Sequence, residues 1–219
     1  MGKNTILTKT QAIVFDQISK NKYIIDNFYF TGGTVLSEFY LHHRFSEDLD
    51  FFTEKPYIQQ EIFNLIDTIC HQHHWEYTAE MIESLYMFHL QIGKNDLLKI
   101  DFSHYPHRRV KEGIKYNQLS VDSLTDIAVN KLITIQQRSQ VKDFVDCYYL
   151  FKKFSLWDLI EGARVKFSLK IEPWILSTDF LNVNSFKSLP RMIKPLTLEQ
   201  LQSYFRNLAK QTGKTAVEE

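Results

Sequence analysis

The chain has 219 residues, and its 26 Lys and Arg balance 26 Asp and Glu, which excludes a polybasic nucleic-acid coat protein and an acidic disordered tail. Apolar residues make up 44% and aromatic residues 14%, with only 7 Gly and 5 Pro, so disordered and low-complexity classes are excluded. No run approaches the ~20 apolar residues of a membrane span, and the first residues lack an apolar signal segment. The sequence contains only two cysteines, Cys70 and Cys147, which offer no disulfide framework and no CxxC metal site and suit a reducing cytosol. We therefore expect a folded, cytoplasmic protein without a membrane partner.

The first half of the chain combines helical and strand patterns. Apolar spacing predicts a helical lead-in over 6–24, a strand over 28–31, a helix over 34–43, a strand over 48–52 and a long helix over 57–74. Three β-rich segments follow, at 75–82, 85–92 and 97–102. This half is therefore predicted to be mixed α/β.

From Asp122 onward the pattern is almost continuously helical. The periodicity predicts helices up to about 138 and over 141–154, 156–167 and 198–210. Strands followed by helices indicate an α+β fold. We expect an α/β catalytic lobe over residues 1–120 and a helical carboxyl-terminal lobe over residues 121–219.

The segment that carries chemistry is Thr31-Gly32-Gly33-Thr34, followed after thirteen residues by Asp48-Leu49-Asp50. Side chains alternate along a strand, so Asp48 and Asp50 project from the same face. Two carboxylates on one face repel each other, and a hard divalent metal such as Mg²⁺ is the usual compensation. The glycine turn opens a helix, where backbone N–H groups and the Thr34 hydroxyl are placed to bind phosphate. This combination is typical of phosphoryl or nucleotidyl transfer.

Asp101 is a third candidate. It lies on the opposite face from Ile100 and Phe102, so it can point toward the aspartate pair from a neighbouring strand. Three carboxylates can hold two metals, or one metal together with a general base for the attacking hydroxyl. We therefore expect Asp48, Asp50 and Asp101 to form a metal and catalytic site.

Two charged residues in the helical half lie on apolar faces. Lys131 lies between Ile127 and Ile135, and Asp143 is aligned with Cys147. A buried Lys131–Asp143 ion pair that joins the two helices is one interpretation. The other is that Lys131 reaches the nucleotide across an interlobe cleft while Asp143 orients it. Both can hold.

Several other residues have weaker signals. Arg44 and His43 can touch phosphate, although the position of His43 on the apolar side of its helix fits a half-buried structural histidine equally well. Asp146, at the edge of the helix face that carries Asp143, is a weaker candidate for the role of Asp143. His71, His73 and His74 suggest zinc, but their position at the end of a helix favours capping of the last carbonyls. In the basic stretch after Asp101, Arg108, Arg109 and Lys111 can bind the phosphate backbone of RNA. The simpler interpretation is a charged loop exposed to solvent.

The run Phe30–Thr34, followed by His43-Arg44, Ser46 and Asp48–Phe52, resembles the AbiEii/AbiGii toxin family of nucleotidyltransferases. The likeness continues at Lys99–Phe102, at Lys131 and at 142–146. The resemblance implies a nucleotidyltransferase-like mixed sheet with helices and a helical carboxyl-terminal part. By this resemblance, the nucleotide is bound by Gly32, Gly33, Thr34, Arg44 and Lys131. Mg²⁺ or Mn²⁺ is bound by Asp48, Asp50 and Asp101, which are also catalytic. The helical lobe contributes a catalytic pair, Lys131 and Asp143.

The function implied is transfer of a nucleotide from an NTP to an acceptor hydroxyl, with RNA, in particular the acceptor end of tRNA, as the expected acceptor. The resemblance also implies that the protein acts as the toxin of a bacterial toxin–antitoxin or abortive-infection pair, with a cognate antitoxin encoded nearby. Transfer to a protein or a small molecule, and a catalytically silent nucleotide-binding protein, remain alternatives. A DxD glycosyltransferase fits less well, because its sugar-nucleotide lobe needs more strands before the motif.

Overall fold

The computed structural model describes residues 5–94 and 96–215. The sequence-based expectation that the first residues form no signal segment concerns a part of the chain that lies mainly outside this range. The described chain separates into two compact units. The first contains the described residues up to Tyr40, Ser46–Arg108 and Glu112–Ser123, and the second contains Leu41–Phe45, Arg109–Lys111 and the described residues from Leu124 onward. The main division thus falls after Ser123. The expected lobe boundary at residues 120/121 stays a prediction.

In the described residues of the first unit, seven strands form one sheet with the order β3-β4-β5-β2-β1-β7-β6. The pairs β2·β5 and β1·β7 are parallel, and the other neighbours are antiparallel. The strands are β1 Tyr29–Thr31, β2 Leu49–Thr53, β3 Glu76–Ile82, β4 Leu85–Gly93, β5 Asp96–His104, β6 Lys115–Tyr116 and β7 Leu119–Val121.

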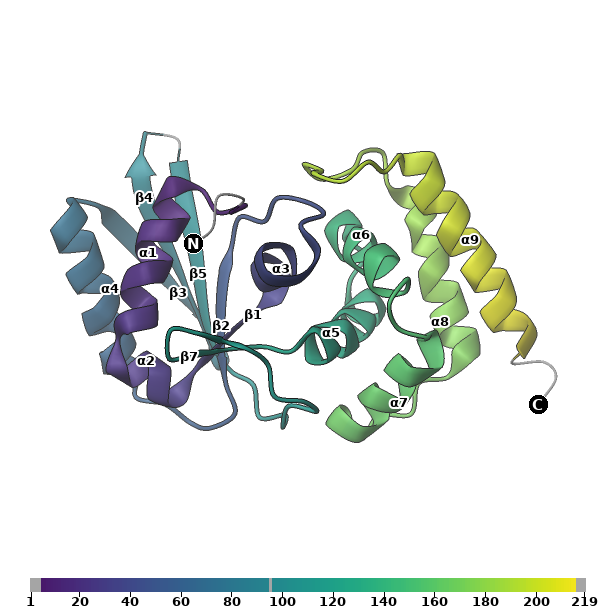
Figure 1. Ribbon diagram of the computed structural model, residues 1–219, viewed down its shortest axis with the longest axis horizontal. Helices are drawn as coiled ribbons and strands as arrows, with labels where there is room; N and C mark the ends of the chain where they lie inside the picture. Colours follow the sequence, from purple (N-terminus) through teal and green to yellow (C-terminus); the bar gives the residue numbers. More distant parts are fainter. Residues whose placement is uncertain (1–4, 95, 216–219) are drawn as a thin grey trace. The chain divides into compact units, whose positions relative to one another are not determined.

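One face of this sheet is covered by helices. Figure 1 shows α1, α2 and α4 together on one side of the strands, with bounds Lys9–Lys20, Lys22–Asn27 and Gln59–His73. The rings of Phe30, Phe51 and Phe102 stack across β1, β2 and β5 on this covered face, and Phe15 of α1 packs on Phe30 at 4.5 Å between ring centroids. Because side chains alternate along each strand, the residues directly before and after each of these phenylalanines project from the opposite face.

The connection from β1 to β2 is helical but irregular. A short α-helix, α3 (Gly32–Val35), continues directly into a π-helix, η1 (Leu36–Leu41). The predicted helix over 34–43 therefore exists, but most of it is a π-helix, whose turns are wider than those of the α-helix that apolar spacing predicts. π-Helical turns are rare and are frequently found at functional sites.

The second unit is helical. Its elements are α5 Leu124–Gln137, α6 Val141–Leu150, α7 Leu156–Phe167, α8 Pro173–Phe180, a short 3₁₀ helix η2 Leu181–Ser185 and α9 Leu198–Thr215, with α8 and α9 side by side in Figure 1. The rings of Phe144 and Phe180 both pack on Phe205 of α9, at 4.9 and 5.5 Å. Gly162 lets α7 approach α5 closely, because a Cβ there would lie 2.6 Å from Val129 Cγ2.

The observed elements agree with most of the predicted ones. The predicted strands over 75–82, 85–92 and 97–102 correspond to β3, β4 and β5. The helix expected over 141–154 is shorter, because α6 ends at Leu150, and α8 was not expected from the sequence. No helix within the described residues has the length and apolar character needed to cross a bilayer.

Candidate active site

Polar side chains form a row across the sheet face opposite the helices. Asp50 of β2 is in register with Asp101 of β5 on one side and with Thr31 of β1 on the other. Directly paired residues project to the same face of a sheet, so these three side chains share the face that α1, α2 and α4 leave uncovered. Asp48 precedes β2 by one residue and also carries its charge close to Asp101. The sequence-based expectation that Asp101 neighbours the aspartate pair agrees with this register.

The Asp50 carboxylate lies directly against the glycine turn. Gly32 has φ +79°, and a Cβ built there would be 2.0 Å from Asp50 Oδ2. Only glycine combines this left-handed backbone with so close an approach. The turn and the carboxylate are therefore held together, as the motif predicted.

The Thr34 hydroxyl has a structural partner within the chain. The Thr34 side chain is fully buried, and its hydroxyl donates a short hydrogen bond to the backbone carbonyl oxygen of Asp48. The hydroxyl thus ties the beginning of α3 to the segment that precedes β2. Contacts of Gly32, Gly33 and Thr34 with a nucleotide stay predictions.

Lys99 places a cation on this face, and sequence reasoning did not assign it a role. Its Nζ lies 2.6 Å from Asp101 Oδ2. Burial acts to lower the pKa of Lys99, but the hydrogen bond and charge of Asp101, with the charges of Asp48 and Asp50, outweigh it and raise this pKa. Burial raises the pKa of Asp101 and Asp48 adds to the effect, while Lys99 opposes both. Lys99 thus neutralises part of the negative charge that the aspartates bring together.

The donor set suits a hard divalent cation in its chemistry. Asp101 Oδ1 is buried and has no hydrogen-bond partner within the described part of the chain, so one carboxylate oxygen is available for a ligand. Carboxylate oxygens are the donors that Mg²⁺ prefers. However, among residues 5–94 and 96–215 no three His, Cys, Asp or Glu side chains are gathered closely enough to hold a metal. The aspartates share a face of the sheet but are not arranged as a complete set of metal ligands, and their assignment as metal ligands stays a prediction.

Asp122 is a further buried carboxylate that the sequence did not indicate. It is fully buried at the end of β7, and its Oδ2 accepts a 2.7 Å hydrogen bond from Thr31 Oγ1. Tyr40 Oη donates to the Asp122 carbonyl oxygen at 2.8 Å. Through Thr31 this network borders the row that contains Asp50, and it fixes the strand end next to the glycine turn.

The second unit contains a cluster of buried charges on α5 and α6. Lys131 Nζ lies 2.7 Å from Asp143 Oδ1 and 2.7 Å from Asp146 Oδ2, and both carboxylates are fully buried. Burial alone would raise the pKa of Asp146, but Lys131 and Arg44 hold it well below its usual value. Arg138 Nε adds a 2.8 Å contact to Asp143. The predicted Lys131–Asp143 ion pair is therefore confirmed, while the catalytic roles of the two residues stay predictions.

Arg44 and His43 join the same cluster. Arg44 is 3% exposed and binds Asp146 with Nε at 2.6 Å and a terminal nitrogen at 2.8 Å. His43 Nε2 lies 2.7 Å from Asp146 Oδ1, and burial lowers its pKa although Asp146 opposes the shift. Arg44 thus stabilises a buried carboxylate, and its expected contact with a phosphate stays a prediction. Asp146, only a secondary candidate from sequence, is the centre of this cluster.

The proposed RNA contacts lie in the long loop after β5. Arg108 and Lys111 are exposed, and Arg109 is half-buried. Asp126 anchors part of this loop, because its carboxylate accepts the backbone N–H groups of Val110 and Lys111 at 2.8 and 3.0 Å. Asp126 also forms a fully buried ion pair with Lys166 at 2.7 Å, which the sequence did not indicate. Contacts of the loop with RNA stay predictions.

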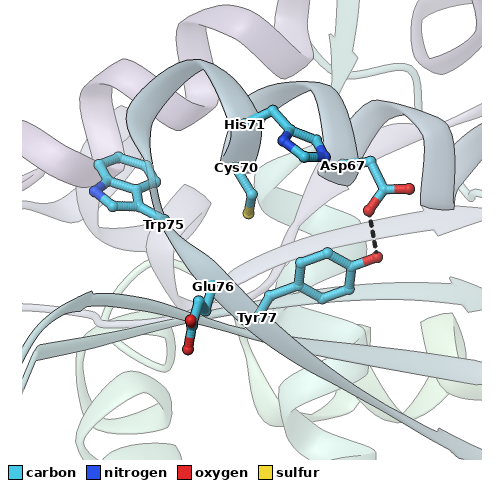
Figure 2. A pocket seen from close by; sticks show the side chains of 6 residues that line it. All are labelled: Asp67, Cys70, His71, Trp75, Glu76 and Tyr77. Atoms are coloured by element: carbon cyan, nitrogen blue, oxygen red, sulfur yellow. Dashed lines mark hydrogen bonds between the residues drawn. The ribbon is translucent and has the colours of Figure 1, made fainter.

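In the described part of the chain, the histidines considered for zinc are not gathered into a metal site. His74 caps α4 with φ 57°, and the His73 ring stacks on Trp75 at 4.5 Å between centroids. His71 lines a pocket of about 330 Å³ between α4 and β3, shown in Figure 2, whose lining is Asp67, Cys70, His71, Trp75, Glu76 and Tyr77. Tyr77 Oη donates to Asp67 at 2.7 Å, and burial raises the pKa of Cys70 to about 11. A thiol with this pKa is a poor metal ligand at neutral pH.

Comparison with solved structures supports the fold. The structure of JHP933 from Helicobacter pylori is similar with a TM-score of 0.58 and 20% identity, covering 97% of this chain and 95% of that chain. MenT4, a nucleotidyltransferase toxin from Mycobacterium tuberculosis H37Rv, is similar with a TM-score of 0.52 and 13% identity, covering 92% and 85%. These neighbours confirm the expected nucleotidyltransferase-like α+β fold.

Sequence comparison gives the family. An uncharacterized protein of Aquifex aeolicus (strain VF5) is 36% identical over 146 residues, which span 65% of this chain and 66% of that relative's length. The family model described as "Nucleotidyl transferase AbiEii toxin, Type IV TA system" matches residues 23–212. This match includes all the residues predicted for the site, and it confirms both the resemblance and the expectation of a nucleotidyltransferase enzyme. The chain therefore belongs to the AbiEii family of nucleotidyl transferase toxins.

Proposed function

We propose that this chain is the toxin of a type IV toxin–antitoxin pair and transfers a nucleotide from an NTP to a hydroxyl of RNA, with the acceptor end of tRNA as its substrate. The observation that carries the proposal is the register of Asp50 with Asp101 on β2 and β5, with Asp50 packed against Gly32. Carboxylates beside a glycine turn combine cation binding with phosphate binding, which nucleotidyl transfer requires. A cognate antitoxin encoded nearby is the expected protein partner.

Asp48 and Asp50, with Asp101, are the residues proposed to hold a divalent cation, Mg²⁺ or Mn²⁺. When bound, such an ion neutralises charge on the triphosphate and on the leaving pyrophosphate. Asp101 is also suited to accept a proton, because burial raises its pKa and its Oδ1 has no hydrogen-bond partner among the described residues. A raised carboxyl pKa brings a general base closer to the pH at which it operates.

The proposed reaction forms one bond and breaks one. The acceptor hydroxyl oxygen bonds to the α-phosphorus of the NTP, and the bond from that phosphorus to the oxygen bridging to the β-phosphate breaks. Pyrophosphate leaves, and the hydroxyl proton passes to the Asp101 carboxylate. The glycine turn at Gly32-Gly33 is proposed to cradle the phosphates through its backbone N–H groups.

The test is incubation of the protein with total RNA, Mg²⁺ and each α-labelled NTP in turn, followed by separation of RNA, protein and small products. Wild-type protein is expected to label RNA, and Asp50→Asn to reduce labelling by at least about a hundredfold, the scale of loss for a catalytic group. Asp26→Asn is the matched control, because Asp26 lies in the same unit with its side chain 51% exposed. Equal labelling by the wild type and Asp50→Asn contradicts the proposed site. Label in protein or in a small molecule instead of RNA moves the acceptor to one of the alternatives.

A further inference from the structure

The second unit presents aromatic rings and exposed cations on one surface, which we call the Tyr–Lys surface. Its residues are Phe45, Tyr148, Tyr149, Lys152, Arg191 and Lys194. The three rings are half-buried, and the three cations are exposed. None of these residues belongs to the carboxylate row or to the loop that contains Arg108.

Each cation of this surface lies close to a ring. Lys152 Nζ is 3.9 Å from the centroid of Tyr148 and 5.4 Å from that of Tyr149. Arg191 Cζ is 4.0 Å from the centroid of Phe45, and Lys194 Nζ is 6.0 Å from that of Tyr149. Each cation is thus paired with an aromatic ring, so a nucleotide that draws the cation onto its phosphate would also meet the ring next to it.

Two of the three segments that build this surface carry cations and no carboxylate, although the chain as a whole is neutral. Residues 147–155 contain Lys152 and Lys153, and residues 186–197 contain Lys187, Arg191 and Lys194, and neither segment contains Asp or Glu. A concentration of cations without carboxylates attracts a polyanion, and interleaved rings add stacking that tolerates any base. This complementarity favours single-stranded nucleic acid over an apolar protein segment.

The surface is held in place by backbone contacts. Phe45 N donates to the Arg191 carbonyl oxygen at 2.9 Å, and Lys194 N donates to the His43 carbonyl oxygen at 3.0 Å. The Tyr149 ring also contacts the His43 ring at 5.1 Å between centroids, and Tyr148 packs edge to face on Tyr204 of α9. These contacts connect the rings to the buried Asp146 cluster and keep them preorganised, which reduces the entropy lost on binding.

We propose that the Tyr–Lys surface binds single-stranded RNA, with the three cations on phosphates and the rings stacked on bases. This inference rests on the proposed function, because it locates the RNA acceptor of that reaction on the helical unit. It differs from the sequence-based prediction, which assigned RNA contacts to Arg108, Arg109 and Lys111.

The test measures fluorescence anisotropy of a labelled, mixed-sequence single-stranded RNA of about twelve nucleotides, within the site sizes of single-strand binders. The assay contains neither NTP nor divalent metal. The variant K152Q/R191Q/K194Q is expected to bind at least tenfold more weakly in ~50 mM salt, and its plot of log affinity against log salt is expected to be shallower by about 2, or ~0.7 per lost phosphate contact. Phe45→Leu is expected to lower affinity at least about fivefold while leaving the salt slope unchanged, because it removes stacking only.

The matched control is R164Q/R206Q/K210Q, which removes the same charge from exposed positions on α7 and α9. Wild-type affinity and slope in K152Q/R191Q/K194Q, or an equal loss in the control, overturns the proposal. So does complete loss of binding in R108Q/R109Q/K111Q with unchanged binding in K152Q/R191Q/K194Q. Loss of antitoxin binding with unchanged RNA affinity assigns the surface to a protein partner and also overturns it.

Failure of this inference and failure of the proposed function give different results. If wild-type protein labels RNA and K152Q/R191Q/K194Q binds RNA as the wild type does, only the Tyr–Lys surface is refuted. If wild-type protein labels no RNA but the surface variants lose RNA binding, the surface stands and the proposed transfer reaction does not.

Discussion

The ammonium of Lys99 lies 2.6 Å from the carboxylate of Asp101, two residues further along β5. Side chains two apart in a strand share a face, so Lys99 belongs to the same surface as Asp50. The charges of Asp48 and Asp50 also act on Lys99 and help to raise its pKa. If the aspartates bind a divalent cation as proposed, that cation would compete with Lys99 for the same negative charge.

Lys99→Met is expected to bind Mn²⁺ more tightly than the wild type, by roughly tenfold, because one competing positive charge is removed from the carboxylates. Without metal, the variant is expected to be less stable by about 1–3 kcal/mol, since the largely buried Asp101 carboxylate then loses its 2.6 Å ion pair with Lys99. Isothermal titration with Mn²⁺ measures the first effect, and urea unfolding with and without Mn²⁺ measures the second.

Lys22→Met is the control for this prediction, because Lys22 pairs with Asp26 at 2.8 Å on the surface and its side chain is 89% exposed. Exposed pairs of this kind contribute about 0–1 kcal/mol. Unchanged Mn²⁺ affinity in Lys99→Met would show that Lys99 does not compete with the metal.

Gly32→Ala is expected to destabilise the first unit by about 1–3 kcal/mol and to abolish nucleotide transfer. An alanine at φ +79° is strained, and its Cβ would lie 2.0 Å from Asp50 Oδ2, so the carboxylate must move. Gly93→Ala is the control, since among the described residues a Cβ there comes within 4 Å only of Asp96 Cβ, at 3.9 Å, an ordinary contact. Thermal unfolding monitored by circular dichroism and the labelling assay measure the two effects. Wild-type stability and activity in Gly32→Ala would contradict the proposed role of the turn.

The local part of the candidate site follows from the sequence. Alternation in a strand predicts that Asp101 points away from Ile100 and Phe102, and the register agrees, since Asp101 pairs with Asp50 while Phe102 pairs with Phe51. Its register with Asp50 depends on a pairing between segments about fifty residues apart, which no local pattern specifies. The register is decided by which apolar faces pack together, and here the stacked rings of Phe51 and Phe102 accompany it.

Buried charge networks were harder to predict. The face of α5 that carries Lys131 indicated an inward charge, and the pair with Asp143 followed from helix periodicity. Asp122 and the Asp126–Lys166 pair gave no such signal, because their partners lie 91 and 40 residues away in the sequence. A carboxylate near the beginning of a predicted helix is ordinarily a solvated residue that favours the helix dipole, so burial of Asp126 becomes visible only in the tertiary structure.

Asp146→Asn is expected to destabilise the second unit by about 3–5 kcal/mol. The substitution removes the charge that faces Arg44 and Lys131 in a fully buried position, and cations left without a counter-charge are costly in the protein interior. Asp26→Asn on the surface is expected to change stability by less than about 0.5 kcal/mol. Urea unfolding of both variants gives the comparison, and equal stabilities would mean that the buried cluster adds nothing beyond an exposed pair.

Stability is expected to fall on acidification in a way that depends on His43. Its folded pKa is lowered, chiefly by burial, whereas the pKa in the unfolded chain is the ordinary value of 6.5. As the pH falls below that value the unfolded chain takes up the proton first, so the contribution of neutral His43 is present above it and is lost as the pH falls toward the folded pKa. The lowered pKa of His43 has a geometric as well as an electrostatic cause. Nε2 faces Asp146, the charges of Arg44 and Lys131 oppose protonation, and the buried Nδ1 finds no acceptor within the described chain.

The measurement is the free energy of unfolding of the wild type and of His43→Gln between about pH 8 and about pH 5, the range in which histidine titrates. Glutamine keeps an N–H donor for Asp146 but takes up no proton. The wild type is expected to lose stability below pH 6.5 with a slope that exceeds that of the variant by up to about 1.4 kcal/mol per pH unit, which corresponds to one proton. Parallel curves for the two proteins would show that His43 does not take up a proton on unfolding, and acid sensitivity would then come from other titrating groups.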